Sequence, residues 1–275
     1  MTRNSEVRSG YDPARHPIDT GAAQAARVDD FLLGGKDNYE ADREVGLELL
    51  RRDPTLPGML RAQRALLTRV VTFLVRDAGL RQFLVIGPGI PTPSSVHTLA
   101  QAVAPESRVV YVEDDPVVLA HARAFMRSAR HGKTAFIRAD LRDPDEILKH
   151  PSLTATLDAR RPIGLVIMDV IHHLRDVDRP HDAVRRLVRW LPSGSYLAMN
   201  TPAADIDPAL MGSLAAIAER GGITVVPRTR SEFERFFVGL ELVPPGVVPT
   251  LAWRPDTKPE DADAVQAYVA VARTP

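Results

Sequence analysis

The feature that most constrains the fold is a regular alternation, after Gly79, between short apolar runs and helical patterns. The runs are rich in β-branched and aromatic residues, and the segments between them repeat apolar residues at spacings of three and four. This alternation is typical of βαβ units, which place parallel strands side by side in one sheet and helices on its faces. The sequence therefore predicts an α/β fold with a largely parallel sheet.

Seven strands are predicted from these runs. They cover residues 82–86, 108–113, 134–138, 163–168, 195–199, 240–243 and 267–272, with helices over 95–103, 117–129, 180–190 and 208–221. A proline-rich stretch, 244–259, separates the last two strands in place of a helix. We therefore expect the last strand to be antiparallel, because antiparallel neighbours need no helical crossover.

The first 79 residues have a different texture. Residues 1–20 are polar and rich in turn formers, so we expect a flexible segment there. Three helical patterns follow, at 22–33, 41–50 and 60–78, and Gly34-Gly35 stands where a helix-ending glycine is expected. We predict a helical cap over 21–79, followed by one α/β domain over 80–275.

Composition limits the classes of function. The chain has 35 basic residues, 35 acidic residues and no cysteine. A balanced charge gives no electrostatic footprint for nucleic acid, and the lack of cysteine excludes disulfides and thiolate metal sites. No apolar stretch has the length of a membrane span, so we expect a cytoplasmic protein that binds neither nucleic acid nor membranes. A homodimer is one option for its assembly.

A candidate ligand site lies at the carboxyl ends of the predicted strands, where open parallel sheets bind their ligands. The first strand runs into Gly87-Pro88-Gly89, a turn that lets backbone approach a ligand, although a tight turn needs glycine without any ligand. The second strand ends in Glu113-Asp114-Asp115. A carboxylate at this point is placed to accept hydrogen bonds from both ribose hydroxyls, so we assign Glu113 to a ribose. We expect Asp115 to cap the next helix.

The third strand adds two residues to the same edge of the sheet. Asp140 and Leu141 directly follow this strand. The acid is placed to accept a hydrogen bond from an adenine amino group, and the leucine is placed to pack on the ring. As an isolated motif, such a pair is more often a solvated turn.

The fourth strand is followed by an acid and two adjacent histidines, Asp169, His172 and His173. The histidines are candidates for a general base or, with Asp169, for a metal site. Adjacent histidines lack the i, i+4 spacing of a zinc helix, which makes metal the weaker interpretation. The alternative is that His172 packs under a ligand and His173 is solvated.

The most specific motif is the string LLGGKDNY at 32–39. Together with Ala26-Arg27-Val28 and stretches at 109–123, 139–144, 236–249 and 268–273, it resembles a bacterial S-adenosyl methyltransferase family with an N-terminal LLGGKDN signature. The resemblance implies a Rossmann-like, seven-stranded class I methyltransferase sheet, S-adenosylmethionine (SAM) as cofactor, and a helical cap beside the pocket. It implies no particular methyl acceptor.

The resemblance also favours a pocket role for the signature, because a glycine pair followed by polar residues suits a lid over a polar cofactor. The alternative is that the string only ends one helix and begins the next. The candidate cofactor-binding residues are Lys36, Asn38, Tyr39, Gly87, Pro88, Gly89, Glu113, Asp114, Asp140, Leu141 and Asp169, the candidate catalytic residues are His172 and His173, and no metal ligand is assigned.

Two positions depart from the family pattern. Val85 stands where the family has an acid in its first strand, and Pro88 stands between the glycines in place of a small residue. The acid normally helps to hold the ammonium of SAM, so its loss predicts binding that is about ten- to a hundredfold weaker. Pro88 removes an N–H donor from the loop. Asp169 is a candidate to compensate.

We expect a SAM-dependent methyltransferase that acts on a small-molecule acceptor, because methyl transfer needs mainly an aligned acceptor and leaves no obligatory motif. The main alternative, favoured by Val85 and Pro88, is a protein of the same fold that binds SAM, S-adenosylhomocysteine (SAH) or another ligand without transferring methyl, as a regulatory or partner protein. A nicotinamide dehydrogenase is a poorer third interpretation, since the glycine turn lacks the third spaced glycine.

Overall fold

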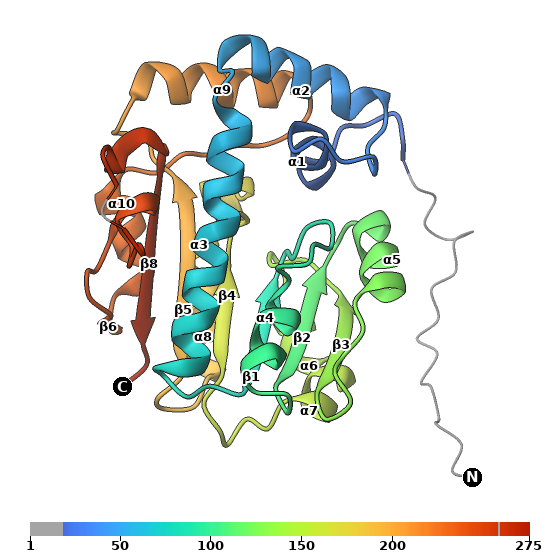
Figure 1. The fold of residues 1–275 in the computed structure, drawn as a ribbon, viewed down its shortest axis with the longest axis vertical. Helices are drawn as coiled ribbons and strands as arrows, with labels where there is room; N and C mark the ends of the chain where they lie inside the picture. The colour runs from blue at the N-terminus through green and yellow to red at the C-terminus, as the bar shows by residue number, and fades with distance from the viewer. Residues whose placement is uncertain (1–18, 258) are drawn as a thin grey trace.

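The structure, a computed structural model, describes residues 19–257 and 259–275, so nearly all of the predicted flexible segment 1–20 lies outside the described residues. The strands are β1 Gln82–Ile86, β2 Arg108–Glu113, β3 Lys133–Arg138, β4 Gly164–Ile167, β5 Tyr196–Pro202, β6 Glu241–Leu242, β7 Val248–Pro249 and β8 Ala267–Arg273. They form one sheet in the order β3-β2-β1-β4-β5-β8-β6, with β7 paired to β8 (Figure 1). The first five strands are parallel, and β8 is antiparallel to its neighbours β5, β6 and β7. The predicted α/β fold with an antiparallel last strand is confirmed.

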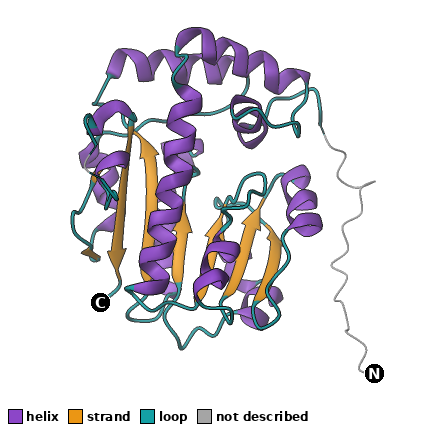
Figure 2. Ribbon diagram, in the orientation of Figure 1, coloured by secondary structure: helices purple, strands orange, loops and turns teal. Residues whose placement is uncertain are grey.

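Helices cover both faces of the sheet (Figure 2). The α-helices of the described residues, those of the cap included, are α1 Ala25–Leu32, α2 Glu40–Arg52, α3 Leu56–Arg76, α4 Val96–Val103, α5 Pro116–Phe125, α6 Pro144–Lys149, α7 Pro151–Thr156, α8 Pro180–Trp190, α9 Pro208–Arg220 and α10 Arg230–Glu234. Each helix from α5 to α9 has proline in its first turn, where the missing N–H would have no helical partner. The prolines of the sequence therefore fix where these helices begin.

The central strands β1 and β4 are mainly apolar because both faces of the sheet are buried there. Leu84 and Val110 pack on one face, in a core shared with α6, α7 and α8. Their neighbours Phe83 and Val109 pack on the other face, in a core shared with α3, α4 and α5. The continuous apolar runs of the sequence thus encode a three-layer arrangement.

The N-terminal helices form a cap above the carboxyl ends of the strands. Val28 and Leu32 of α1 and Val45 of α2 pack with Ala218 of α9 and with Ile223. Figure 1 shows α2 and α9 side by side across the top, and α3 running from this layer down along the sheet. The long helix α3, which lies inside the predicted cap, therefore also covers one face of the sheet.

Two details differ from the sequence prediction. An eighth strand, β7, lies inside the proline-rich stretch, and Pro249 limits it to two residues because proline cannot donate to a ladder. Helix α5 ends at Phe125 instead of residue 129, since the backbone N–H of Ala129 turns to Gln101 Oε1 of α4, 2.7 Å away. Within residues 19–257 and 259–275, no helix is both long and apolar enough to cross a membrane.

Candidate functional site

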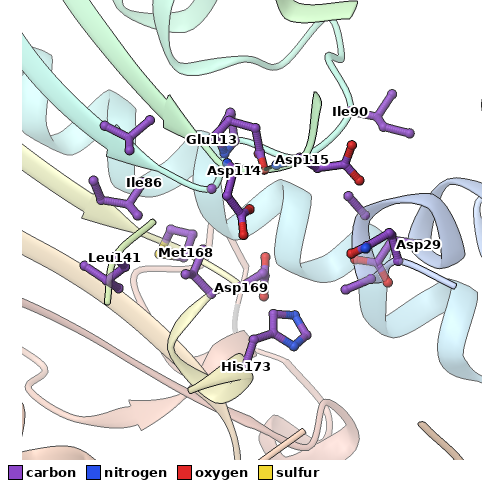
Figure 3. Close-up of a pocket in the computed structure, with 18 of the residues that line it drawn as sticks. Asp29, Ile86, Ile90, Glu113, Asp114, Asp115, Leu141, Met168, Asp169 and His173 are labelled. Atoms are coloured by element: carbon purple, nitrogen blue, oxygen red, sulfur yellow. Dashed lines mark hydrogen bonds between the residues drawn. The ribbon is translucent and has the colours of Figure 1, made fainter. Parts of the chain in front are cut away.

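A cavity of about 510 Å³ lies between the sheet and the cap. One side of it is formed by residues at the carboxyl ends of β1 to β4, and the other by residues of α1 and α3 and by the segment 221–224. Figure 3 shows several carboxylates from different elements around this space. The volume is that of a small-molecule or cofactor site, roughly 300–1,000 Å³. The cavity occupies the edge of the sheet at which the sequence predicted a ligand.

The glycine turn after β1 forms the base of the cavity. Gly87 has a φ of +62°, and a Cβ at this position would lie 2.3 Å from Val170 Cγ2. Gly89 has a φ of +64°, and a Cβ added there would meet no atom within 4 Å, so its backbone conformation alone calls for glycine. The turn therefore needs Gly87 for close packing as well as for conformation, with or without a ligand.

Glu113 ends β2 with a side chain that is 7% exposed and lines the cavity. Its Oε1 accepts hydrogen bonds from the backbone N–H groups of Asp114 and Asp115, at 3.1 and 3.0 Å. Burial raises the pKa of Glu113 to about 8, and the charges of Asp114 and Asp115 add to the rise. A ligand that donates hydrogen bonds to this carboxylate would stabilise its ionised form.

The two acids after Glu113 have different surroundings. Asp115 Oδ1 accepts hydrogen bonds from the N–H groups of Val117 and Val118, at 2.7 and 3.4 Å. The predicted capping role of Asp115 is thus confirmed. Asp114 is exposed and lines the cavity beside Glu113.

The end of β3 supplies an acid and an apolar surface. Asp140 and Leu141 both line the cavity. Asp140 Oδ1 accepts from the Arg142 N–H at 2.7 Å, and Oδ2 pairs with Arg142 Nη1 at 2.7 Å. Leu141 is buried, with 3% of its surface exposed. The acid is therefore held by Arg142 as in a solvated turn, while it still borders the cavity.

Asp169, after β4, is fixed by a pair of hydrogen bonds. Its backbone N–H donates to Asn200 Oδ1, and Asn200 Nδ2 donates to Asp169 Oδ1, both at 2.6 Å. The residue has a φ of 58°, a left-handed conformation that aspartate tolerates better than most residues. Burial raises the pKa of Asp169 to about 6. A partly buried carboxyl group is thus held rigidly against the cavity.

The two predicted catalytic histidines lie in a short 3₁₀ helix, η1 Ile171–His173, and only His173 lines the cavity. Its Nδ1 lies 2.7 Å from the Thr224 carbonyl oxygen. Because a carbonyl only accepts, Nδ1 carries the proton and Nε2 keeps its lone pair. Burial lowers the pKa of His173, which favours the neutral ring.

His172 does not line the cavity, although its ring centroid lies 4.0 Å from that of His173. Its Nδ1 is buried and has no hydrogen-bond partner among the described residues. The alternative interpretation of the sequence placed His172 under a ligand and His173 in solvent, whereas in the structure His173 lines the cavity and His172 is buried outside it. The turn of η1 decides which ring faces inward, and sequence spacing carries no information on it.

The signature string folds back on the cap instead of lining the cavity. Asp30 Oδ2 accepts hydrogen bonds from the Asp37 N–H and from Asn38 Nδ2, both at 2.8 Å. A Cβ on Gly35 would lie 2.0 Å from Asp30 Oδ1, so this glycine is required for the turn.

The three predicted cofactor ligands of this string follow from that turn. Lys36 is exposed, Asn38 is engaged by Asp30, and Tyr39 lies under the Arg27 guanidinium at 5.2 Å. None of Lys36, Asn38 and Tyr39 is among the residues that line the cavity. The structure thus places them apart from the site, because the string folds toward Asp30 and donates hydrogen bonds to its buried carboxylate.

Two charged residues that line the cavity from the cap were not predicted. Asp29 of α1 and Arg64 of α3 both face the cavity from the cap. Burial and the negative charge of Asp169 raise the pKa of Asp29 to about 7, against an opposing effect of Arg64. One feature of the sequence marks Asp29: it follows the small residues Ala25 and Ala26 at helical spacing, and all three line the cavity from α1.

The wall at β1 carries no charge. Val85, 4% exposed, and Pro88 both line the cavity at the position where the family pattern predicted an acid and a small residue. Among the residues that the structure describes, no group of three or more His, Asp or Glu side chains is arranged to hold a metal ion. The charged groups of the cavity therefore come from the cap and from residues at or after the ends of β2, β3 and β4.

The donors and acceptors present fit SAM. Its adenosine part needs hydroxyl acceptors and an apolar surface, which Glu113 and Leu141 offer, and its cationic sulfonium and ammonium need negative charge. The nearby carboxyls of Asp114, Asp169 and Asp29 provide that charge (Figure 3).

Comparison with known proteins finds a matching family and similar solved structures. A family model described as S-adenosyl methyltransferase matches residues 12–275. A DUF574 family protein from Streptomyces avermitilis is 44% identical, with a TM-score of 0.91, over 94% of this chain and 100% of that chain. A protein from Thermobifida fusca is 40% identical, with a TM-score of 0.83, over 94% of this chain and 97% of that chain.

A more distant structure supports the fold alone. Mitomycin 7-O-methyltransferase MmcR is 16% identical, with a TM-score of 0.51, over 90% of this chain and 71% of that chain. No curated protein matches the chain.

Proposed function

The chain belongs to the S-adenosyl methyltransferase family, with SAM as its cofactor, and from this premise we propose that it transfers the methyl group of SAM to a small-molecule acceptor. The observation that carries the proposal is the buried carboxyl of Glu113 at the end of β2, in a cavity of cofactor size. A carboxylate there serves a ribose in the dinucleotide- and nucleoside-binding sheets.

The cofactor is proposed to lie across the ends of four strands. The order β3-β2-β1-β4 brings Asp140 and Leu141, Glu113, the glycine turn and Asp169 into one row. Adenine would lie at Leu141, ribose at Glu113, and the methionine end beyond the glycine turn. Three steps of about 4.8 Å between neighbouring strands give about 14 Å, which accommodates these parts in sequence.

The acceptor is proposed to be small because the cap covers the cavity. Residues of α1 and α3 and the segment 221–224 form the side that faces the sheet, so the acceptor must fit between the cap and the strand ends. The chain carries no net charge, so no field favours a large polyanionic acceptor. SAM supplies an electrophilic methyl group, and the protein must mainly hold the acceptor in line with it and exclude water.

His173 is the candidate base where the acceptor must lose a proton. The Thr224 carbonyl fixes its tautomer, so Nε2 is the nitrogen free to take a proton. Its lowered pKa keeps the ring neutral near pH 7, which a base requires. His172, outside the cavity, has no comparable access to an acceptor.

The test is isothermal titration of the native chain, Glu113→Gln and a control, Glu146→Gln, with SAM, SAH and NAD. Glu146 is exposed in α6 and does not line the cavity. We expect the native chain and the control to bind SAM and SAH but not NAD, and Glu113→Gln to lose at least tenfold in affinity, since a hydrogen bond to a charged group contributes about 1.5–3 kcal/mol.

An absence of SAM and SAH binding by the native chain would contradict the proposal. Restoration of binding by Val85→Asp would then show that this chain has lost the cofactor site of its family. Where binding is found, transfer of a labelled methyl group to a panel of small amines and hydroxyl compounds would identify the acceptor class.

A further inference from the structure

Asp29 and Arg64 are charged side chains of the cap that have no partner for their charge in the part of the chain that the structure describes. Both line the cavity, and neither side chain takes part in a hydrogen bond or in an ion pair within 4.0 Å there. Asp29 is half-buried, whereas Arg64 is exposed at the cavity. A charged group such as Asp29 that is partly removed from water without a partner costs free energy. Such a cost is commonly retained where a ligand completes the interaction.

The charges of these two residues and of Asp169 influence one another. The negative charge of Asp169 contributes to the raised pKa of Asp29, and the positive charge of Arg64 lowers the pKa of both acids. Asp169 follows β4, and Asp29 of α1 lies across the cavity from it (Figure 3). Arg64 of α3 lines the same cavity, so two carboxyls and one guanidinium border it.

The order of the strand ends determines which part of the cofactor lies near Asp169, Asp29 and Arg64. If ribose lies at Glu113 and adenine at Leu141, the chain of the cofactor leads away from β3, across the glycine turn of β1, to β4. The methionine end arrives there with one ammonium and one carboxylate. The first strand offers neither group a charged partner, because Val85 is apolar and Pro88 has no N–H.

We propose that the cap binds the amino-acid end of SAM, with Arg64 pairing with its carboxylate and Asp29, beside Asp169, pairing with its ammonium. This inference rests on the proposed function, since it needs SAM in the cavity. It accounts for the apolar residue at Val85: the charge that the family pattern places on β1 is supplied here from α1 and α3. Arginine suits the role because its guanidinium binds a carboxylate in a fixed, bidentate geometry.

The test compares two ligands that differ only at this end. SAH contains adenine, ribose and the amino acid, whereas 5′-methylthioadenosine lacks the amino acid. Both are titrated into the native chain, Asp29→Asn, Arg64→Gln and Glu113→Gln. The matched controls are Glu44→Gln of α2 and Arg61→Gln, one turn before Arg64 in α3, since both residues are exposed and lie outside the cavity lining.

We expect Arg64→Gln and Asp29→Asn to weaken SAH binding about ten- to a hundredfold, the effect of a charge-assisted hydrogen bond, and to change 5′-methylthioadenosine binding less than about twofold. Glu113→Gln should weaken both ligands alike, and the controls neither. With a des-carboxy analogue of SAH, Arg64→Gln should have no effect, while Asp29→Asn should still weaken binding.

Equal losses for SAH and 5′-methylthioadenosine in Arg64→Gln and Asp29→Asn would overturn the inference, because they would indicate general damage to the site. Unchanged SAH binding in both variants would overturn it as well, and would instead favour a role of these residues in binding the methyl acceptor. Failure of the proposed function has a different signature: the native chain would bind neither ligand, or Glu113→Gln would bind both as tightly as the native chain does.

Discussion

The carboxyl of Glu113 couples the stability of the protein to pH. Its folded pKa of about 8 lies above its ordinary value of 4.5, so the folded state binds this proton more tightly than the unfolded state does. The free energy of unfolding should therefore fall as pH rises from about 5 to about 8. Glu113→Gln should remove this part of the slope and stabilise the ligand-free protein by about 1–3 kcal/mol at pH 8.

Urea denaturation at several pH values between 5 and 8.5 would measure this difference. The opposite behaviour is expected for the ligand, since only the ionised carboxylate accepts hydrogen bonds from both ribose hydroxyls, so SAH affinity should rise over the same pH range. Identical pH slopes for the native chain and Glu113→Gln would show that burial does not perturb this group.

Some residues of the site were predictable and others were not. Glu113, Asp140 and Asp169 were found because a polar residue directly after an apolar run marks the end of a strand. Asp29 and Arg64 were missed because each lies in a helix that precedes the sheet in sequence, and only the paths of α1 and α3 bring them to the cavity. No spacing in the sequence encodes that path.

Among the elements, the junction of α1 and α2 depends on one buried ion pair. Arg27 Nε lies 3.1 Å from Asp42 Oδ2, with 1% and 0% of the two side chains exposed. Asp42 also accepts hydrogen bonds from the backbone N–H groups of Gln24 and Tyr39. Arg27→Met should destabilise the protein by about 3–5 kcal/mol, because it leaves a buried carboxylate without its partner.

The control for this prediction is Arg27→Met combined with Asp42→Leu, which removes both charges. Part of the loss should return, but not all, since Leu cannot accept the two backbone hydrogen bonds. Denaturation midpoints of the three proteins would measure the difference. A loss below about 1 kcal/mol in the single variant would mean that water reaches Asp42 and replaces the arginine.

The regular elements were predicted well because their patterns are local. Continuous apolar runs identified β1 to β5, and prolines marked the first turns of several helices. The two-residue strand β7 and the early end of α5 were missed, because each depends on a contact with a distant element: β7 with β8, and Ala129 with Gln101. Such contacts follow from the assembled fold.

For the whole molecule, α3 joins the cap to the sheet. Its middle and C-terminal residues, such as Leu66 and Val70, belong to the core beneath the sheet, while Arg64 and Leu67 face the cavity. A ligand that contacts both the cap and the strand ends should therefore reduce the motion of the cap relative to the sheet.

Hydrogen exchange followed by mass spectrometry would measure this coupling. SAH at 100 times its Kd raises the free energy of unfolding of the protein by about 2.7 kcal/mol. Exchange should slow at the ends of β1, β2 and β4 and also in α1 and the first half of α3. 5′-Methylthioadenosine should slow exchange at the strand ends alone. Equal protection of α1 by the two ligands would contradict a role of the amino-acid end in closing the cap.

The structural role of the string LLGGKDN follows from its position around Asp30. Gly35 leaves room for the Asp30 carboxylate, and the Asp37 N–H and the Asn38 amide bind it. The string therefore specifies how the N-terminal layer is built, because none of residues 32–39 lines the cavity. The identity of the acceptor should accordingly be sought by comparing the cavity residues of this protein with those of other methyltransferases, and not by comparing this string.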